Sequence, residues 1–341
     1  MSDLVRVGFV GCGLIARSHA RGLQACGEAT IVAVHDTDPE RAHSFALDVV
    51  GTASVVVADA ETVIETSEAV YVCTWTAAHA DLVAAVAAAG KPVFCEKPLA
   101  IDLATAEAMT RAVESAGVVN QVGLVLRNSP SFRWLRHQVR SPELGPLMNI
   151  VFRDDQYLPT QGMYGSTWRG DVAKAGAGTL LEHSIHDLDL LGWMMGPIRS
   201  VSGRIGMVHG LDGIDDQASV LLVSESGAQA TLTSVWHEVL SRPSQRRVEA
   251  FCRDAVLTLD GDWAGPVSIE SSMGTDELEG SVLARAMATL DGLGVNPDAA
   301  FITAVRSSIP AYPDFRVAIE AHRLADAAYR SAATGGQPVD L

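Results

Sequence analysis

The sequence predicts a two-domain α/β protein, with a doubly wound parallel sheet first and a large, open, mostly antiparallel sheet second. Three observations support this fold class. A glycine turn joins the first expected strand to the first helix, strands alternate with helices up to about residue 125, and later strands follow one another with short turns. We therefore expect a cofactor domain over residues 1–125 and an α+β domain over residues 126–341, because a chain of 341 residues exceeds what one core usually supports.

The glycine turn has the pattern G-x-G-x-x-A and follows the apolar run LVRVGFV. In such a unit Gly11 permits the tight turn, Gly13 lets the backbone approach a pyrophosphate, and Ala16 lets the helix pack closely on the sheet. Leu14 and Ile15 open the helix, whose N-terminus then faces the phosphates. The pattern is typical of a dinucleotide-binding Rossmann domain, although a tight turn can need glycines without any ligand.

The second expected strand, ATIVAVHD, ends at Asp36, which lies 20 residues after Ala16. A dinucleotide site needs an acidic residue at this place to bind the ribose 2′-hydroxyl. A simple turn residue is the alternative interpretation, since DTDPE is also a turn sequence. The spacing favours the cofactor role. Because a carboxylate repels a 2′-phosphate and Thr37 supplies no cation, we expect NAD rather than NADP.

The strand and helix alternation continues to the end of the first domain. Further strands are expected over residues 53–59, 69–74, 90–98 and 118–127, with helices over 78–89 and 102–116. Ligands of doubly wound sheets bind beyond the carboxyl ends of the strands. Five polar residues lie at or just after such ends: Thr74, His79, Glu96, Lys97 and Arg127. Lys97 is one of only three lysines, and Pro98 after it favours an extended backbone, but a solvated lysine is the alternative interpretation.

In the second domain the expected elements are mostly strands. We expect a helix over 131–140, strands over 147–157, 201–210, 218–225, 228–239, 246–254 and 255–262, and a last helix over about 315–333 that covers the sheet or returns to the first domain. Apolar spacing over residues 179–195 predicts a buried helix. On this helix Glu182, His186 and Asp189 would share one stripe, at i, i+4 and i+7.

This stripe allows three interpretations. A zinc site would need a third or fourth ligand, and the H-E-x-x-H spacing is absent, so we expect no metal. A structural role for the histidines is the default on an isolated helix. The catalytic interpretation makes His186 a base, because imidazole, with a pKa of about 6.5, accepts a proton at neutral pH. Asp189 would support it, while His183 and Asp187 form a second pair with no expected role.

Together these features resemble the glucose-fructose oxidoreductase and inositol dehydrogenase family, also called Gfo/Idh/MocA. The resemblance covers essentially the whole chain and rests on GFVGCGLIARSHA, Asp36, GKPVFCEKPLA and EHSIHDLD, in this order. It implies that Lys97, the lysine of E-K-P, is catalytic, and that Glu182 and His186 match the family's aspartate and histidine pair. It also implies a sheet with one face free to pack against another subunit, in a homodimer or homotetramer.

Two departures from the family pattern stand near these residues. Trp75 replaces a proline, and Glu182 replaces an aspartate, which changes the reach of the carboxylate. Trp168 and Arg169 lie in a glycine-rich loop before the 179–195 segment. Both are expected to bind substrate, together with Arg127, Glu182, His186 and Lys97. For Trp168 and Arg169 the alternative interpretation is an ordinary surface loop.

The expected reaction is a reversible, NAD-dependent oxidation of a secondary hydroxyl on a sugar or cyclitol. His186 would take the hydroxyl proton, Lys97 would stabilise the developing alkoxide, and Glu182 would orient His186 or a neighbouring hydroxyl. The alternatives are an enzyme that retains and recycles NAD while acting on glycosides or keto-sugars, and a non-catalytic NAD or sugar sensor.

Composition bounds the partners and the compartment. A net charge of −16 argues against nucleic acid and anionic membrane surfaces. Five cysteines without a C-x-x-C pair fit a reducing compartment, and neither a signal peptide nor a run of roughly 20 apolar residues is present. We therefore expect a cytoplasmic protein whose partner is a small polyol or sugar.

Overall fold

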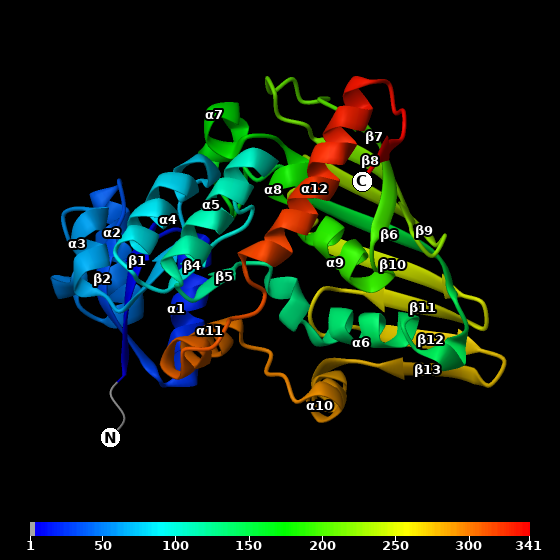
Figure 1. Cartoon of the computed structure of the whole chain (residues 1–341), viewed down its shortest axis with the longest axis horizontal. Coiled ribbons are helices and arrows are strands. Elements are labelled where there is room, and N and C mark those ends of the chain that lie inside the picture. The colour runs from blue at the N-terminus through cyan, green and yellow to red at the C-terminus, as the bar shows by residue number, and fades with distance from the viewer. Residues whose placement is uncertain (1–3) are drawn as a thin grey trace. The chain divides into compact units, whose positions relative to one another are not determined.

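The computed structural model describes residues 4–341, which form two units (Figure 1). The first unit comprises residues up to Leu124 together with Asn296–Ile319, and the second comprises Val125–Val295 and Glu320–Leu341. Residues 296–319 were expected in the second domain. They belong to the first unit because α11 (Pro297–Ser307) places Phe301 and Ile302 in its core.

The first unit contains the predicted parallel sheet, and the predicted fold class is confirmed. Its five strands are all parallel in the order β2-β1-β3-β4-β5. Their apolar residues are buried on both faces, as in doubly wound sheets. The strands are β1 (Val5–Val10), β2 (Ala29–His35), β3 (Ala69–Val72), β4 (Val93–Cys95) and β5 (Asn120–Val122).

Helices pack on both faces of this sheet. On one face Phe9, Tyr71 and Phe94 from the neighbouring strands β1, β3 and β4 stack, with ring centroids 4.8 and 4.7 Å apart, and pack with residues of α1 and α11. On the other face Val70 and Val93 pack with α4 and α5. The helices are α1 (Leu14–Cys26), α2 (Pro39–Phe45), α3 (Ala60–Thr66), α4 (His79–Ala88) and α5 (Leu103–Ala116); shorter helical turns cover Ala46–Val50, Ala53–Val55 and Thr76–Ala78.

The prediction of a strand over residues 53–59 is wrong. Ala53–Val55 form a 3-10 turn, and only Val56 makes an isolated parallel bridge, to Val34 of the edge strand β2. The valines here are only partly buried. A β-rich run beside an edge strand gains few ladder hydrogen bonds and little burial, so propensity alone does not make a strand.

The second unit contains a nine-stranded sheet in the order β13-β12-β11-β10-β6-β9-β8-β7-β14. Each neighbouring pair is antiparallel except β6 and β9, which are parallel. Three strands, β12, β13 and β14, were not predicted, because they are short and β13 is almost entirely exposed and polar. The strands are β6 (Leu147–Tyr157), β7 (Ile198–Gly206), β8 (Gln217–Ser224), β9 (Gln229–His237), β10 (Gln245–Cys252), β11 (Ala255–Asp260), β12 (Val267–Ser271), β13 (Gly274–Leu278) and β14 (Val339–Asp340).

Helices cover one face of this larger sheet (Figure 1). They are α6 (Pro130–Val139), α8 (Thr179–Glu182), α9 (Ile185–Met195), α10 (Gly280–Asp291) and α12 (Phe315–Ala333). The short helix α7 (Val172–Ala175) and turns at Val125–Asn128, Pro142–Leu144 and Thr167–Gly170 lie in the connecting segments. On the strands, buried residues alternate with exposed ones such as Val151, Leu221 and Phe251. Over residues 4–341 no helix is both long and apolar enough to cross a membrane.

Candidate functional site

The turn between β1 and α1 has the geometry that a dinucleotide needs. Gly11 has φ 92°, and a Cβ there would overlap the carbonyl of Cys73 at the end of β3, so only glycine fits. A Cβ on Gly13 would meet nothing within 4 Å, which leaves space in front of the helix.

The start of α1 carries neither a side-chain cap nor an acidic residue in its first turn. Its first N–H groups and positive end therefore suit a phosphate. Ala16 is fully buried, whereas Leu14 and Ile15 are 51% and 40% exposed. Exposed apolar residues beside an uncapped helix start are available to contact a cofactor.

Asp36 connects the glycine turn to the start of α2. Its Oδ2 accepts a hydrogen bond from the Cys12 amide at 2.9 Å, and its Oδ1 accepts one from the Asp38 amide at 2.9 Å. Arg41 also donates to Oδ1, at 3.3 Å, and its side chain is half exposed. The sequence argument considered only Thr37 and missed this cation, which lies one helical turn further along.

Thr74 lies in the loop that follows β3, and His79 is the first residue of α4, after that loop. The His79 ring is 1% exposed, with Nδ1 3.1 Å from the Pro98 carbonyl oxygen and Nε2 3.3 Å from that of Thr74. The ring thus joins the loops that follow β3 and β4 at the carboxyl edge of the sheet. The peptide bond between Lys97 and Pro98 is cis, which the sequence left open.

Glu96 turns its carboxylate toward α1. Its Oε1 lies 2.8 Å from Nε2 of His19, and its Oε2 accepts a hydrogen bond from the Lys97 amide at 3.1 Å. The other ring nitrogen of His19, Nδ1, lies 2.8 Å from Oδ1 of Asp298 on α11. His19 and Asp298 were not predicted; a histidine among the buried residues of α1 is the signal that could have drawn attention to the first of them.

In the second unit, the predicted continuous helix over 179–195 is interrupted. Helix α8 ends at Glu182 and α9 begins at Ile185, with His183 and Ser184 between them. The Ser184 hydroxyl donates to Asp154 at 3.0 Å, on β6. This bond holds the residue between the two helices against the sheet. The prediction that Glu182, His186 and Asp189 share one stripe of a single helix is therefore wrong, because Glu182 lies on α8 and the other two on α9.

Three of the predicted substrate residues nevertheless come together. The Arg169 Nε donates to Oε2 of Glu182 at 3.2 Å, and the Arg169 guanidinium lies over the Trp168 ring at 4.4 Å. The Glu182 side chain is fully buried, and Arg169 is only partly exposed. Ionic pairing with Arg169 therefore fixes the Glu182 carboxylate. His186 is 8% exposed, in the first turn of α9.

Asp189 does not take the supporting role that we expected. Arg127 donates two hydrogen bonds to the Asp189 carboxylate, from Nε to Oδ2 at 2.8 Å and from Nη2 to Oδ1 at 2.7 Å. Both side chains are nearly buried, and the Arg127 guanidinium also lies over the Trp193 ring at 5.0 Å. This bidentate pair ties the start of the second unit to α9. A role for Arg127 in substrate binding stays a prediction.

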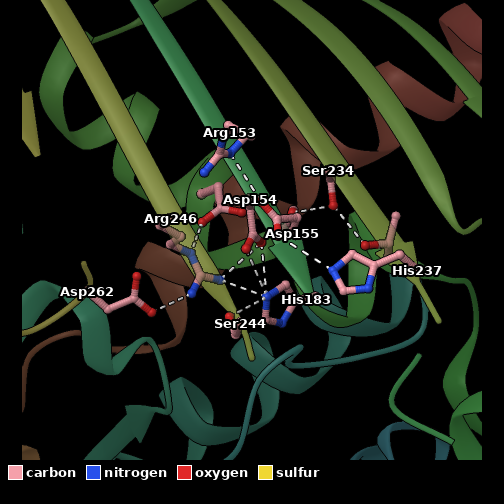
Figure 2. A network of polar contacts seen from close by, with 12 residues as sticks. Arg153, Asp154, Asp155, His183, Ser234, His237, Ser244, Arg246 and Asp262 are labelled. Atoms are coloured by element: carbon pink, nitrogen blue, oxygen red, sulfur yellow. Dashed lines mark hydrogen bonds and ion pairs between the residues drawn. The ribbon is translucent and has the colours of Figure 1, made fainter. Parts of the chain in front are cut away.

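His183 and Asp187, which had no expected role, belong to a buried ionic network (Figure 2). At its centre Arg246 donates from Nε to Asp187 at 2.6 Å, from Nη2 to Asp154 at 3.2 Å and from Nη1 to Asp262 at 2.8 Å. His183 Nε2 lies 3.0 Å from Asp154. One guanidinium therefore serves three carboxylates, one of them on α9, and Asp154 also contacts His183 within the break between α8 and α9.

Asp187 is the carboxyl of this network that holds a proton most readily. Burial raises its pKa to about 7, and the neighbouring Asp154 adds to this rise while Arg246 opposes it. Its Oδ1 accepts from Arg246, whereas its Oδ2 is buried and accepts from no described residue. A proton on the Asp187 carboxyl relieves the repulsion between it and the Asp154 carboxylate.

This proton gives a prediction for stability against pH. Because the folded-state pKa of Asp187 is about 7 and its ordinary value is 3.8, the folded chain holds a proton that the unfolded chain has released between these values. The free energy of unfolding contributed by this group therefore falls as pH rises from about 4 to about 7. We expect Asp187→Asn to remove this contribution in urea unfolding at several pH values. The exposed Asp276→Asn is the control, and an unchanged slope in the Asp187 variant would contradict the assignment.

Comparison with known proteins matches the two parts of the chain to two different domain families. Residues 5–124 match the oxidoreductase family with an NAD-binding Rossmann fold, and residues 132–258 match the Gfo/Idh/MocA C-terminal domain. The chain is 28% identical over 336 residues to inositol 2-dehydrogenase of Rhizobium meliloti (strain 1021), across 96% of this chain and 97% of that protein.

Two solved structures have the same fold. An inositol dehydrogenase homolog complexed with NAD+ from Azotobacter vinelandii matches with a TM-score of 0.87 and 21% identity, over 100% of this chain and 98% of that one. Levoglucosan dehydrogenase, complexed with NADH and levoglucosan, matches with a TM-score of 0.88 and 19% identity, over 99% of each chain. With both domain matches in order along the sequence, the chain belongs to the Gfo/Idh/MocA family of NAD-binding oxidoreductases.

Proposed function

We propose that this protein catalyses the reversible, NAD-dependent oxidation of a secondary hydroxyl on a cyclitol or sugar ring, with an inositol as the first candidate. The observation that carries the proposal is the similarity to an inositol 2-dehydrogenase over nearly the full length of both chains. The family assignment favours a dehydrogenase over a non-catalytic sensor, and Lys97, Glu182 and His186 keep the residue types that the chemistry needs.

Residues of the first unit would hold the cofactor. The uncapped start of α1 and the open space at Gly13 suit the pyrophosphate, and Asp36 at the end of β2 suits the ribose hydroxyls. When bound, NAD supplies the hydride acceptor. These observations fit the cofactor that the sequence predicted, and Thr74, His79 and Glu96 remain proposed cofactor contacts.

Three side chains would transfer the proton, stabilise the developing negative charge and bind a substrate hydroxyl. His186 would accept the hydroxyl proton, because a neutral imidazole is a competent base near neutral pH. Lys97 would donate to the substrate oxygen and stabilise negative charge as the alkoxide develops. Glu182, held by Arg169, would bind a neighbouring hydroxyl, since a carboxylate is an acceptor for the hydroxyl groups of a polyol.

The substrate is identified by following NADH formation with a panel of inositols, aldoses and levoglucosan. We expect oxidation of at least one cyclitol or sugar, with turnover proportional to added NAD. Conversion of a panel member without net NADH formation, in dialysed protein without added NAD, would instead support the enzyme that retains and recycles its cofactor. No NADH formation, together with tight binding of a panel member, would contradict the dehydrogenase proposal.

The pairing of Asp36 with Arg41 gives a prediction for cofactor preference. We expect Asp36→Ser to lower kcat/KM for NAD by about tenfold or more, since a hydrogen bond to a charged group contributes about 1.5–3 kcal/mol. The kcat/KM for NADP should rise, because Arg41 loses its Asp36 partner and can turn to a 2′-phosphate. In the matched double variant Asp36→Ser with Arg41→Ala the gain should disappear. Undiminished preference for NAD in the single variant would contradict the role of Asp36.

We also propose that the exposed face of the nine-stranded sheet forms a homodimer or homotetramer interface. Val151, Leu221 and Phe251 lie on three strands of this sheet and are 36–41% exposed. Apolar residues on an otherwise uncovered sheet face favour association. The described cysteines are free thiols, which supports a reducing, cytoplasmic location.

A further inference from the structure

We infer that His19 is a positioning residue for the reaction, acting as a buried imidazolium that holds the Glu96 carboxylate ionised and fixed, and through Glu96 the backbone of Lys97. The inference rests on the proposed function, in which Lys97 meets the substrate oxygen. His19, Glu96 and Asp298 all lie within the first unit, on α1, after β4 and on α11.

The geometry requires both ring nitrogens of His19 to donate. Each nitrogen lies 2.8 Å from a carboxylate oxygen, Nε2 from Glu96 and Nδ1 from Asp298. A neutral imidazole has one donor and one acceptor nitrogen, so one carboxylate would face a lone pair. The three side chains are only 4–7% exposed, which leaves little water to relieve that repulsion. The charged ring satisfies both contacts.

The surroundings preserve this charge. The two carboxylates raise the pKa of His19 to about 10, although burial alone would lower it. The rings of Tyr71 and Phe94 pack against the imidazole, with centroids 5.6 and 4.7 Å away. His19 is therefore protonated throughout the neutral pH range.

The backbone around the cluster leaves room for the two carboxylates. A Cβ on Gly123 would overlap the Glu96 carboxylate, and a Cβ on Gly22 would overlap that of Asp298. Glycine at both places lets α1 and the residue that follows β5 approach the carboxylates closely. The cluster is thus part of the packing of the strands and helices, and the Lys97 amide joins it through its hydrogen bond to Glu96.

The ionised state of the Glu96 carboxylate depends on the cations beside it. Burial is the largest influence and raises its pKa, but His19 and then Lys97 outweigh burial and hold the pKa below its ordinary value. The other titratable groups around the cluster are Cys73, Cys95 and Tyr71, whose pKa values burial raises well above their ordinary values, so all three stay neutral. Without the His19 charge, Glu96 should take up a proton at higher pH.

The Lys97 amide is the direct reporter of Glu96, because it donates to Oε2. The chain has only three lysines, so protein labelled with 15N-lysine gives three backbone amide signals, and Lys97→Arg assigns the one from Lys97. We expect the Lys97 amide of the His19→Asn variant to show a titration step of Glu96 at a higher pH than in the wild type, because the cation that lowers the pKa of Glu96 is removed. The step should be absent from the double variant His19→Asn with Glu96→Gln.

Activity provides the second readout. With the substrate found in the panel, His19→Asn should lower kcat about tenfold near pH 7, with a smaller change in KM for NAD, and should move the acid limb of kcat/KM to higher pH. The double variant should be no slower than Glu96→Gln alone, because His19 acts through Glu96. The matched control is His43→Asn, an exposed histidine on α2 bonded to the Pro39 carbonyl, which should leave both readouts unchanged.

Two results would overturn the inference. One is a Lys97 amide signal in His19→Asn that follows the wild-type signal at every pH. The other is a loss of kcat that adds fully to that of Glu96→Gln. If His19→Asn does not fold, Asp298→Asn provides the test. It removes one carboxylate partner of the His19 ring and so lowers the pKa of His19. The change of the Lys97 amide signal that accompanies deprotonation of His19 should then occur at lower pH than in the wild type. The amide readout needs no substrate, so it separates this inference from failure of the proposed function.

Discussion

Lys97→Ala is expected to lower kcat for oxidation of the substrate by about 10²- to 10⁴-fold, the range in which a positioned acid or base contributes. The physical reason is the loss of the ammonium that would stabilise the developing alkoxide. NAD binding should weaken far less, because the open turn at Gly13 and the Asp36 carboxylate remain. Steady-state NADH formation and calorimetric titration with NAD measure the two effects.

The matched control is Lys174→Ala. Lys174 lies in α7, is about half exposed, and its ammonium is 3.4 Å from Asp171 one turn away. A surface pair of this kind contributes little, so we expect kcat within about twofold of the wild type. Equal activity in the Lys97 and Lys174 variants would contradict the assignment of Lys97 as catalytic.

Arg246→Met is expected to lower the free energy of unfolding by about 3–5 kcal/mol, the cost of removing one partner from a buried ionic group. Its removal leaves Asp154, Asp187 and Asp262 without their shared cation, and the first two are fully buried. Methionine keeps much of the side-chain volume, so the loss reports charge rather than a cavity. Urea unfolding measures it.

Arg247→Met is the control from the same strand. Arg247 is half exposed and lies 3.7 Å from Glu249, so its replacement should change the free energy of unfolding by less than about 1 kcal/mol. If both variants unfold at the same urea concentration, the network does not stabilise the break between α8 and α9 as we describe.

The parallel sheet and its cofactor turn were predictable because their signals are local. The glycine turn, the acid at the end of β2 and the alternation of strands and helices each occupy a few consecutive residues. Where tertiary context decides, prediction was wrong: the edge position removed the strand expected over 53–59. The bond from Ser184 to Asp154 accompanies the break in the helix expected over 179–195.

The candidate site was predictable only in part. The resemblance predicted roles for Lys97, Glu182 and His186, which stay predictions, and the structure brings Arg169 to Glu182. The partners that fix these residues come from distant positions: Asp298 is 279 residues from His19, and Arg246 is 59 residues from Asp187. No spacing rule joins such residues, because their proximity follows from the packing of whole elements rather than from helix or strand periodicity.

The most direct test of the account is NADH formation from the oxidised panel member by the wild type, Lys97→Ala and His186→Ala, each shown to be folded and to bind NAD. The account predicts turnover in the wild type and a loss of about 10²-fold or more in each variant. Turnover at the wild-type rate in either variant, or no oxidation of any cyclitol or sugar by the folded, NAD-bound wild type, would contradict it.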